Sequence, residues 1–145
     1  MNSIAQLNRK LAGIEAKVRV IVVSSIKRHE KQIIKRNQDQ LKKGEDANTD
    51  QLGNYKDRKW IAKRKKKGLQ TKYVDLKFSG DFTKSMFVKF DSAGMSLGLD
   101  ATDKKKGILI HHWGEDILGL NDQNFDWLFD VIFDDLYKGL NTYFK

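Results

Sequence analysis

The stretch IAQLNRKLAGIEAKVRVI, from Ile4 to Ile21, decides the fold of this 145-residue chain. Its apolar residues recur at alternating spacings of three and four, which is the a/d seam of a packed helix. They are Ile4, Leu7, Leu11, Ile14, Val18 and Ile21. The helical pattern continues beyond this seam until Gly44, a residue typical of helix C-termini. The sequence therefore predicts one helix, residues 1–43 of the chain, running from about Ser3 to Lys43.

The second half of this helix has a different character. KRHEKQIIKRNQDQLKK, residues 27–43, is strongly basic and has few apolar anchors, so we expect it to project from the core. A helix of about 40 residues spans roughly 60 Å, which is long for a domain of this size. The seam therefore suggests packing against another element or another subunit. The alternative, a single amphipathic helix lying on its own sheet, stays open.

The middle of the chain predicts a polar connection and then a small antiparallel sheet. Residues 44–72 are polar and basic, and their second part could be a short helix ending at Gly68 or a flexible arm. YVDLKF, residues 73–78, alternates as a half-buried strand does. FVKFD and MSLGLD, joined by SAG, have the signature of a hairpin with Gly94 at the turn. We assign residues 73–113 to this sheet, with ATDKKKG as a charged loop.

Residues 114–145 predict a corner followed by a C-terminal helix. Gly114 and Gly119 bracket EDIL as a tight connection, and the residue type of Asn121 predicts an N-cap. The residues expected to fill the core at this corner are Trp113, Ile117, Leu118 and Leu120. One broad apolar helix face follows, made of Phe125, Leu128, Phe129, Ile132, Phe133, Leu136 and Leu140. The fold class is α+β in a single domain of 145 residues. Gly80 and Gly119 sit at abrupt changes of pattern, where we expect a positive φ.

Composition excludes several classes of protein. The chain has no cysteine and no proline, so disulfides, thiolate metal sites and cysteine nucleophiles are ruled out. The N-terminal residues lack the apolar core and cleavage site of a signal peptide. No apolar run approaches the ~18 residues that cross a bilayer. We expect a soluble intracellular protein without a membrane partner.

The net charge of +9 is unevenly placed. Residues 56–72 contain nine basic side chains and one acidic, whereas residues 114–145 contain seven acidic and two basic. Opposite ends of this kind could meet head to tail between copies, or the basic segment could face a phosphate backbone. The densest part is KRKKKG, whose DNA- or partner-facing candidates are Lys63, Arg64, Lys65, Lys66 and Lys67. Trp60, just before it, could stack on a base or anchor the segment to the core.

Two other clusters could in principle carry chemistry. His111 and His112 are consecutive and so point in different directions, and with Glu115 they still provide fewer ligands than the three that zinc needs. Aspartates recur every four residues and could bind magnesium, but no histidine, lysine or glycine-rich loop stands beside them. They are Asp122, Asp126, Asp130 and Asp134. We expect this acidic row to be solvated or to face another subunit, and we expect no catalytic residue, metal or cofactor.

Two short motifs in the second half of the chain point to a family. In SGDFTKS, the residues Ser79, Gly80, Phe82 and Ser85 follow a TG-x-L/F-x-x-S step into a small sheet. In GEDILGLN, a G…LGL(S/T/N) corner is formed by Gly114, Gly119, Leu120 and Asn121. With LKKGEDANTDQLGNYKD, they resemble tail-completion or virion-morphogenesis proteins of tailed bacteriophages, the minor tail protein Z type. The resemblance covers roughly residues 34 to 140, and the PxRPF segment common in that family is replaced by EDILGL.

The resemblance implies a non-enzymatic structural component of the virion, located in the neck between portal and tail. Such proteins form homo-oligomeric rings around the DNA channel and contact neighbouring portal, connector or tail proteins. It also implies residence in the virion, and in the host cytoplasm during assembly. The motif residues would then be structural. The alternative is a sequence-independent nucleic-acid-binding protein that uses the basic 56–72 arm and the 27–43 helix.

Overall fold

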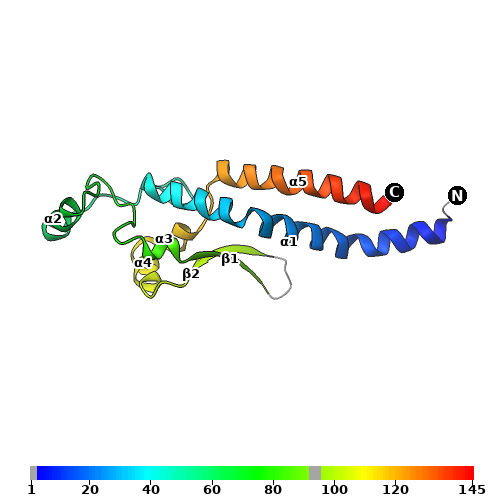
Figure 1. Ribbon diagram of the computed structural model, residues 1–145, viewed down its shortest axis with the longest axis horizontal. Coiled ribbons are helices and arrows are strands. Elements are labelled where there is room, and N and C mark those ends of the chain that lie inside the picture. Colours follow the sequence, from blue (N-terminus) through cyan, green and yellow to red (C-terminus); the bar gives the residue numbers. More distant parts are fainter. Residues whose placement is uncertain (1–2, 92–95) are drawn as a thin grey trace.

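The protein has the expected α+β fold in a computed structural model that describes residues 3–91 and 96–145. Its elements, in chain order, are α1 (Ile4–Lys42), α2 (Arg58–Lys66), α3 (Asp81–Lys84), β1 (Met86–Phe90), β2 (Leu97–Ala101), α4 (Lys106–Trp113), the 3-10 helix η1 (Glu115–Leu118) and α5 (Asp122–Phe144). Figure 1 shows an elongated molecule in which α1 runs along most of the length with α5 beside it. The helix α2 lies at one end, and the two chain termini lie together at the other.

Both predicted ends of the long helix are confirmed. At the N-terminus, Ser3 and Gln6 form a capping box, because each side chain accepts a hydrogen bond from the backbone N–H of the other. At the C-terminus, Lys43 is the cap and Gly44 has a φ of 77°. This left-handed conformation is cheap for glycine alone, so Gly44 ends the helix.

The expectation that the second half of α1 projects from the core is wrong. Four of the six buried residues of α1 lie in that half: Ile33, Asn37, Gln40 and Leu41. The other two, Ser25 and Ile26, come directly before it. At the other end, Ile4 is 79% exposed. There α5 runs antiparallel to α1 and ends beside Lys10, whose Nζ lies 3.4 Å from the carbonyl oxygen of Phe144. The first turns of α1 therefore extend past α5, while the sheet and the corner cover its basic half.

The middle of the heptad seam packs against α5, which confirms packing against another element. Gly139 of α5 allows the close approach, since a Cβ there would lie 2.5 Å from Cδ1 of Ile21. Next to this contact, Ser25 Oγ donates a 2.6 Å hydrogen bond to Asp135. That hydrogen bond lowers the pKa of Asp135, and the positive charge of Arg28 adds to the effect.

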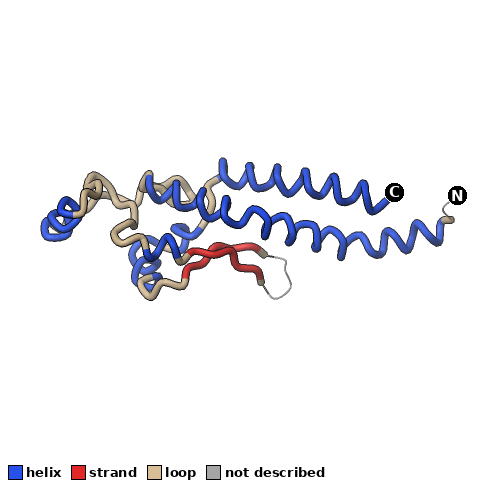
Figure 2. The backbone as a smooth tube through the Cα atoms, viewed as in Figure 1, coloured by secondary structure: helices blue, strands red, loops and turns tan. Residues whose placement is uncertain are grey.

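The predicted hairpin is confirmed as β1 and β2, which pair antiparallel from Met86↔Ala101 to Phe90↔Leu97. The expected turn at Gly94 lies outside the described residues. Figure 2 shows these as the two strands of the fold, running alongside α1. Met86, Val88 and Ala101 are buried, so one face of this small sheet contributes to the core.

The strand predicted at Tyr73–Phe78 is not present. Leu76 has a φ of 54°, which bends the chain, and Asp75 is buried rather than facing solvent. Among the described residues of the predicted sheet region, 73–113, only β1 and β2 are strands, because residues 81–84 form α3 and residues 106–113 form α4. The side chain of Trp113 at the end of α4 donates a 3.1 Å hydrogen bond to the carbonyl of Leu52, which fastens the helix to the polar connection.

The predicted corner between α4 and α5 is confirmed. Gly114 has a φ of 81°, and Ile117 of η1 is fully buried. The residues of α1 that hold the corner are polar: Asn37 donates to the carbonyls of residues 117 and 119, and Gln40 donates to residue 119 and accepts from the backbone N–H of Asn121. Asn121 in turn caps α5, accepting from the N–H of residue 124 at 3.0 Å.

The expectation of a positive φ is confirmed for Gly80, whose φ is 87°. It is wrong for Gly119, whose backbone is extended with a φ of −148°. Gly119 is needed for another reason, since a Cβ there would lie 2.7 Å from the Cβ of Ala47.

Among the helices described, none combines the length and apolar character required to cross a membrane.

Candidate assembly surfaces

The basic segment forms a short helix, not a flexible arm. Asp57 caps α2 by accepting hydrogen bonds from the backbone N–H groups of Lys59 and Trp60, at 2.7 and 3.0 Å. The helix ends at Lys67 and Gly68, whose φ is 69°. The N-cap at Asp57 and the left-handed Gly68 therefore fix the two ends of α2 within the basic run.

Arg64 does not face solvent, which corrects its prediction as a DNA- or partner-facing residue. Its side chain is 1% exposed and forms a bidentate ion pair with Asp75, at 2.9 and 3.1 Å. The same guanidinium donates to the backbone carbonyls of Gln70 and Lys77. A buried charge is tolerated only when paired and hydrogen-bonded in this way. Arg64 thus fastens α2 to the bent segment that follows it.

Tyr55 completes this buried cluster. The guanidinium carbon of Arg64 lies 4.3 Å from the centre of the Tyr55 ring. The Tyr55 hydroxyl donates a 3.0 Å hydrogen bond to Asp75. Burial raises the pKa of Tyr55 to about 12, with the Asp75 carboxylate contributing in the same direction. Tyr55 therefore stays protonated and keeps donating at physiological pH.

Trp60 anchors α2 to the body of the protein. Its ring lies 4.5 Å from that of Phe78, centre to centre. The ammonium of Lys67 lies 4.3 Å from the centre of the same Phe78 ring. Of the two roles considered for Trp60, the structure shows the anchor, and the indole is half-buried.

The other four predicted residues of the basic run are exposed: Lys63, Lys65, Lys66 and Lys67. Within residues 3–91 and 96–145, no carboxylate forms an ion pair with any of these four lysines. Their positive charge is therefore available to something outside the subunit, either an acidic protein surface or a phosphate backbone.

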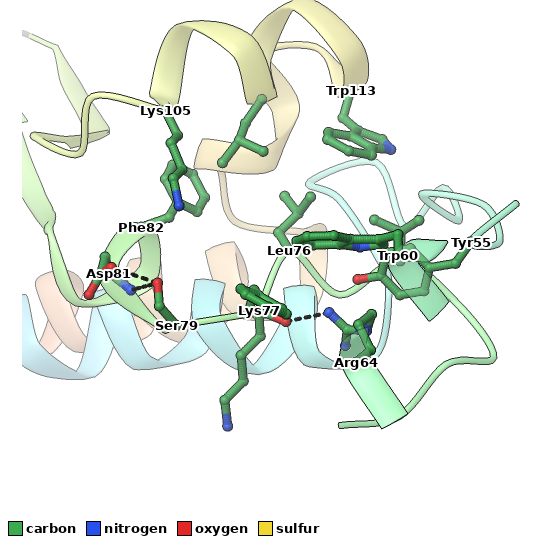
Figure 3. Close-up of a pocket in the computed structure, with 14 residues that line it drawn as sticks. Tyr55, Trp60, Arg64, Leu76, Lys77, Ser79, Asp81, Phe82, Lys105 and Trp113 are labelled. Atoms are coloured by element: carbon green, nitrogen blue, oxygen red, sulfur yellow. Dashed lines mark hydrogen bonds between the residues drawn. The ribbon is translucent and has the colours of Figure 1, made fainter. Parts of the chain in front are cut away.

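A pocket of about 200 Å³ lies beneath α2, between the bent segment and α4. Its lining is mostly aromatic and aliphatic, including Trp60, Leu76, Phe82 and Trp113. Figure 3 shows the two tryptophans on one side of the pocket and Phe82 with Lys105 on the other. Lys105 contributes an exposed cationic side chain to its lining, whereas the side chain of Lys77 extends away from the two tryptophans. The pocket thus combines an apolar interior with positive charge.

The apolar face predicted for the C-terminal helix is only partly covered. Leu128 is buried against α1 and the sheet, but a row of four aromatic residues is between 58% and 64% exposed: Phe125, Phe129, Phe133 and Tyr137. These residues are spaced by four, so they form a continuous strip along α5. Monomeric proteins rarely expose contiguous apolar patches of this kind unless the patch binds a partner.

The predicted acidic row runs next to this aromatic row. All four of its members are exposed: Asp122, Asp126, Asp130 and Asp134. Asp134 pairs with Lys138 at 2.6 Å, while no lysine or arginine of the described chain pairs with Asp126 or Asp130. The acidic row is thus exposed in this subunit, and whether it is solvated or faces another subunit stays a prediction.

The family-motif residues hold local structure. Ser79 bonds Asp81 at the start of α3, Phe82 is in the core, and Ser85 accepts from the backbone N–H of Asp103. Leu120 packs against the core beside Leu128. The two candidate histidines, His111 and His112, are exposed at the end of α4. In the described part of the chain, no three His, Cys, Asp or Glu side chains are grouped so as to hold a metal ion.

The sequence did not indicate two surface features. The pocket was missed because its walls come from three separate parts of the chain. The exposure of the aromatic row was missed because an apolar helix face is ordinarily buried. The available signal was the spacing of four between aromatic residues, at Phe125, Phe129, Phe133 and Tyr137.

No protein-family model, curated protein or solved structure matches this chain.

Proposed function

We propose that this protein is a structural component of a tailed-bacteriophage virion, a head–tail connector or tail-completion subunit of the neck that assembles as a ring around the DNA channel. The observation that carries the proposal is the exposed aromatic row of α5, with its members 58% to 64% exposed. Four adjacent aromatic side chains in water are costly, and a second protein surface is what removes that cost. The resemblance of the two glycine-containing motifs supplies the identity of the assembly.

The charge distribution supports a ring over a symmetric dimer. The acidic row lies on α5, and the unpaired lysines lie on α2 at the far end of the molecule (Figure 1). Two unlike surfaces at separate places make a heterologous contact, which repeats head to tail and closes into a ring when the rotation permits. A basic helix on each subunit would then repeat around the channel and touch DNA through phosphates alone.

The mass of the protein in solution and in purified particles tests this proposal. We expect wild-type protein to form a discrete oligomer in analytical ultracentrifugation, and to be present in particles in a copy number that is a multiple of its ring. Phe129→Ser combined with Phe133→Ser should reduce assembly. Ile108→Ser is the matched control, because Ile108 is 63% exposed but lies on α4. A protein that stays monomeric at all concentrations and is absent from particles would refute the proposal.

The alternative function, sequence-independent nucleic-acid binding, is favoured by the four exposed lysines. Titration of fluorescent DNA duplexes across a salt series separates the two. For a ring component we expect the isolated subunit to bind at about 10⁻⁴ to 10⁻⁶ M without sequence preference, as nonspecific binding does. Changing Lys63, Lys65, Lys66 and Lys67 to glutamine, with the buried Arg64 retained, should weaken that binding and spare the fold. Nanomolar, sequence-selective binding by the monomer would favour the alternative.

A further inference from the structure

The aromatic pocket beneath α2 and the aromatic row of α5 have complementary chemistry. We infer that the α5 face of one copy docks into this pocket on the next copy, with Phe129 as the side chain that enters. The inference rests on the proposed function and deepens it, because it names the two surfaces that form the subunit interface.

The size and lining of the pocket suit one aromatic ring. The cavity has a volume of about 200 Å³, and a cavity of roughly 150 Å³ lined by apolar side chains is enough to bind benzene. Trp60, Phe82 and Trp113 would surround an entering phenyl ring with aromatic faces and edges. An aromatic anchor filling a pocket is also the usual centre of a protein interface.

Charge selects which residue of the row enters. Lys105 is exposed in the lining of the pocket beside Phe82, so the docking helix should carry carboxylates next to its anchor. Phe129 has Asp126 and Asp130 beside it, and neither is paired within the described subunit. Phe133, one turn further, has Asp130 and Asp134 at the same spacings, but the charge of Asp134 is already paired with Lys138, so Phe133 has only one unpaired carboxylate beside it. At the other end of the row, Phe125 lines a groove with Leu97 and Leu99 of its own subunit.

The same charges argue against the simplest other arrangement. If the α5 helices of two copies packed on each other through their aromatic rows, their aspartate rows would also meet. α5 contains five aspartates and one lysine, so such a pair would bring like charges together. Docking α5 on the lysine-bearing end of the molecule instead places opposite charges together and repeats head to tail.

Site-directed crosslinking tests the contact. Because the chain has no native cysteine, only the introduced cysteines can react. Two populations, one with Asp130→Cys and one with Lys105→Cys, are mixed, allowed to assemble and treated with a short bismaleimide. We expect the mixed dimer to exceed either self-crosslinked dimer by about tenfold, because only the mixed pair meets at the interface. Glu15→Cys replaces Asp130→Cys as the control, since Glu15 is an exposed acid on α1.

Charge reversal gives a second, independent readout. Lys105→Asp should raise the concentration at which assembly is half complete by at least about tenfold. Asp126→Lys with Asp130→Lys should do the same, and mixing the two variants should recover assembly through the one complementary interface. Lys31→Asp is the charge-matched control for Lys105→Asp, at an exposed position of α1 outside its uncovered N-terminal turns. Circular dichroism of every variant checks that the fold is retained.

The outcomes separate the inference from the proposed function. If the wild-type chain never assembles, both the ring proposal and the docking inference are refuted. Assembly with dominant Asp130→Cys self-crosslinking, or assembly unaffected by both charge reversals, overturns the inference and leaves the ring proposal standing. Crosslinking of the pocket cysteine only to a different phage protein assigns the pocket to that partner and likewise overturns docking between copies.

Discussion

At the residue scale, Arg64 shows how one member of a uniform charge run differs from its neighbours. Lys63 and Lys65, on either side of it, are exposed, while Arg64 is 1% exposed and paired with Asp75. The helical turn alone produces this difference, because consecutive residues point about 100° apart. The face of α2 that carries Trp60 and Arg64 is therefore a structural face, and only the remaining lysines are available to a partner.

Replacing Arg64 by methionine should lower the free energy of unfolding by about 3–5 kcal/mol, because it leaves Asp75 buried without its cation. Lys65→Met removes a charge at the next position and should change stability by no more than about 0.5 kcal/mol, since that side chain is exposed. Urea denaturation followed by circular dichroism measures both. Equal stability in the two variants would contradict the buried ion pair.

The hydroxyl of Tyr55 gives a prediction about pH. Its pKa is raised to about 12, above the value of about 10 in an unfolded chain. A group whose folded pKa is raised contributes stability that is fully present below pH 10 and is lost as the pH rises through 12. We therefore expect a tyrosine absorbance titration with a late phase near pH 12 that accompanies loss of structure. The Tyr55→Phe variant should lack this phase, and its persistence would assign the phase elsewhere.

At the element scale, the position of α5 depends on polar contacts from α1. Gln40 donates to the carbonyl of Gly119 and accepts from both the backbone of Asn121 and the side chain of Asn124. One side chain therefore holds the exit of the corner and the first turn of α5. The direction of the aromatic row follows from this contact, because the row is carried by the helix that Gln40 positions.

Gln40→Leu should destabilise the protein by about 1–3 kcal/mol for each buried polar group that it leaves without a partner. We also expect weaker assembly, since the first turn of α5 loses its anchor. The control is Gln32→Leu, an exposed glutamine two turns earlier on α1. Thermal unfolding and sedimentation of the two variants test this, and identical melting temperatures would show that the corner is held without the hydrogen bonds of Gln40.

At the scale of the whole molecule, order should decrease along α1 from its C-terminal half to its N-terminus. The buried residues of α1 begin at Ser25, whereas Ile4, Leu7 and Leu11 are exposed where the helix extends past α5. Segments with few buried apolar contacts open locally at low free energy. The uncovered turns are thus a further apolar surface that is available to a neighbouring subunit.

Hydrogen exchange should follow this gradient. In dilute, unassembled protein, amides of residues 5–12 should exchange much faster than those of residues 26–41, although both belong to one helix. In the assembled protein the difference should shrink if a neighbour covers the N-terminal turns. Uniform protection along the helix of the isolated subunit would contradict the uncovered overhang.

The sequence alone determined the elements whose signals are local. Both ends of α1, the hairpin strands, the corner at Gly114 and the cap at Asn121 each follow from residue type and spacing within one turn or one strand pair. The α+β fold class followed from their order. The acidic row was also readable, because charge on a helix face requires no knowledge of the rest of the chain. The basic run was predicted as five outward-facing residues, of which only the four lysines are exposed.

Only the tertiary structure decided which faces are covered. Periodicity says that Ile4 and Ile33 both belong to apolar positions of one helix, but burial depends on where α5 ends and where the sheet lies. Asp75 and Arg64 appear solvent-facing in their local patterns and are buried because they satisfy each other. The aromatic row of α5 is exposed for the converse reason, since this subunit provides no surface to cover it. Burial is a property of contacts between distant segments, and local sequence carries no direct record of those contacts.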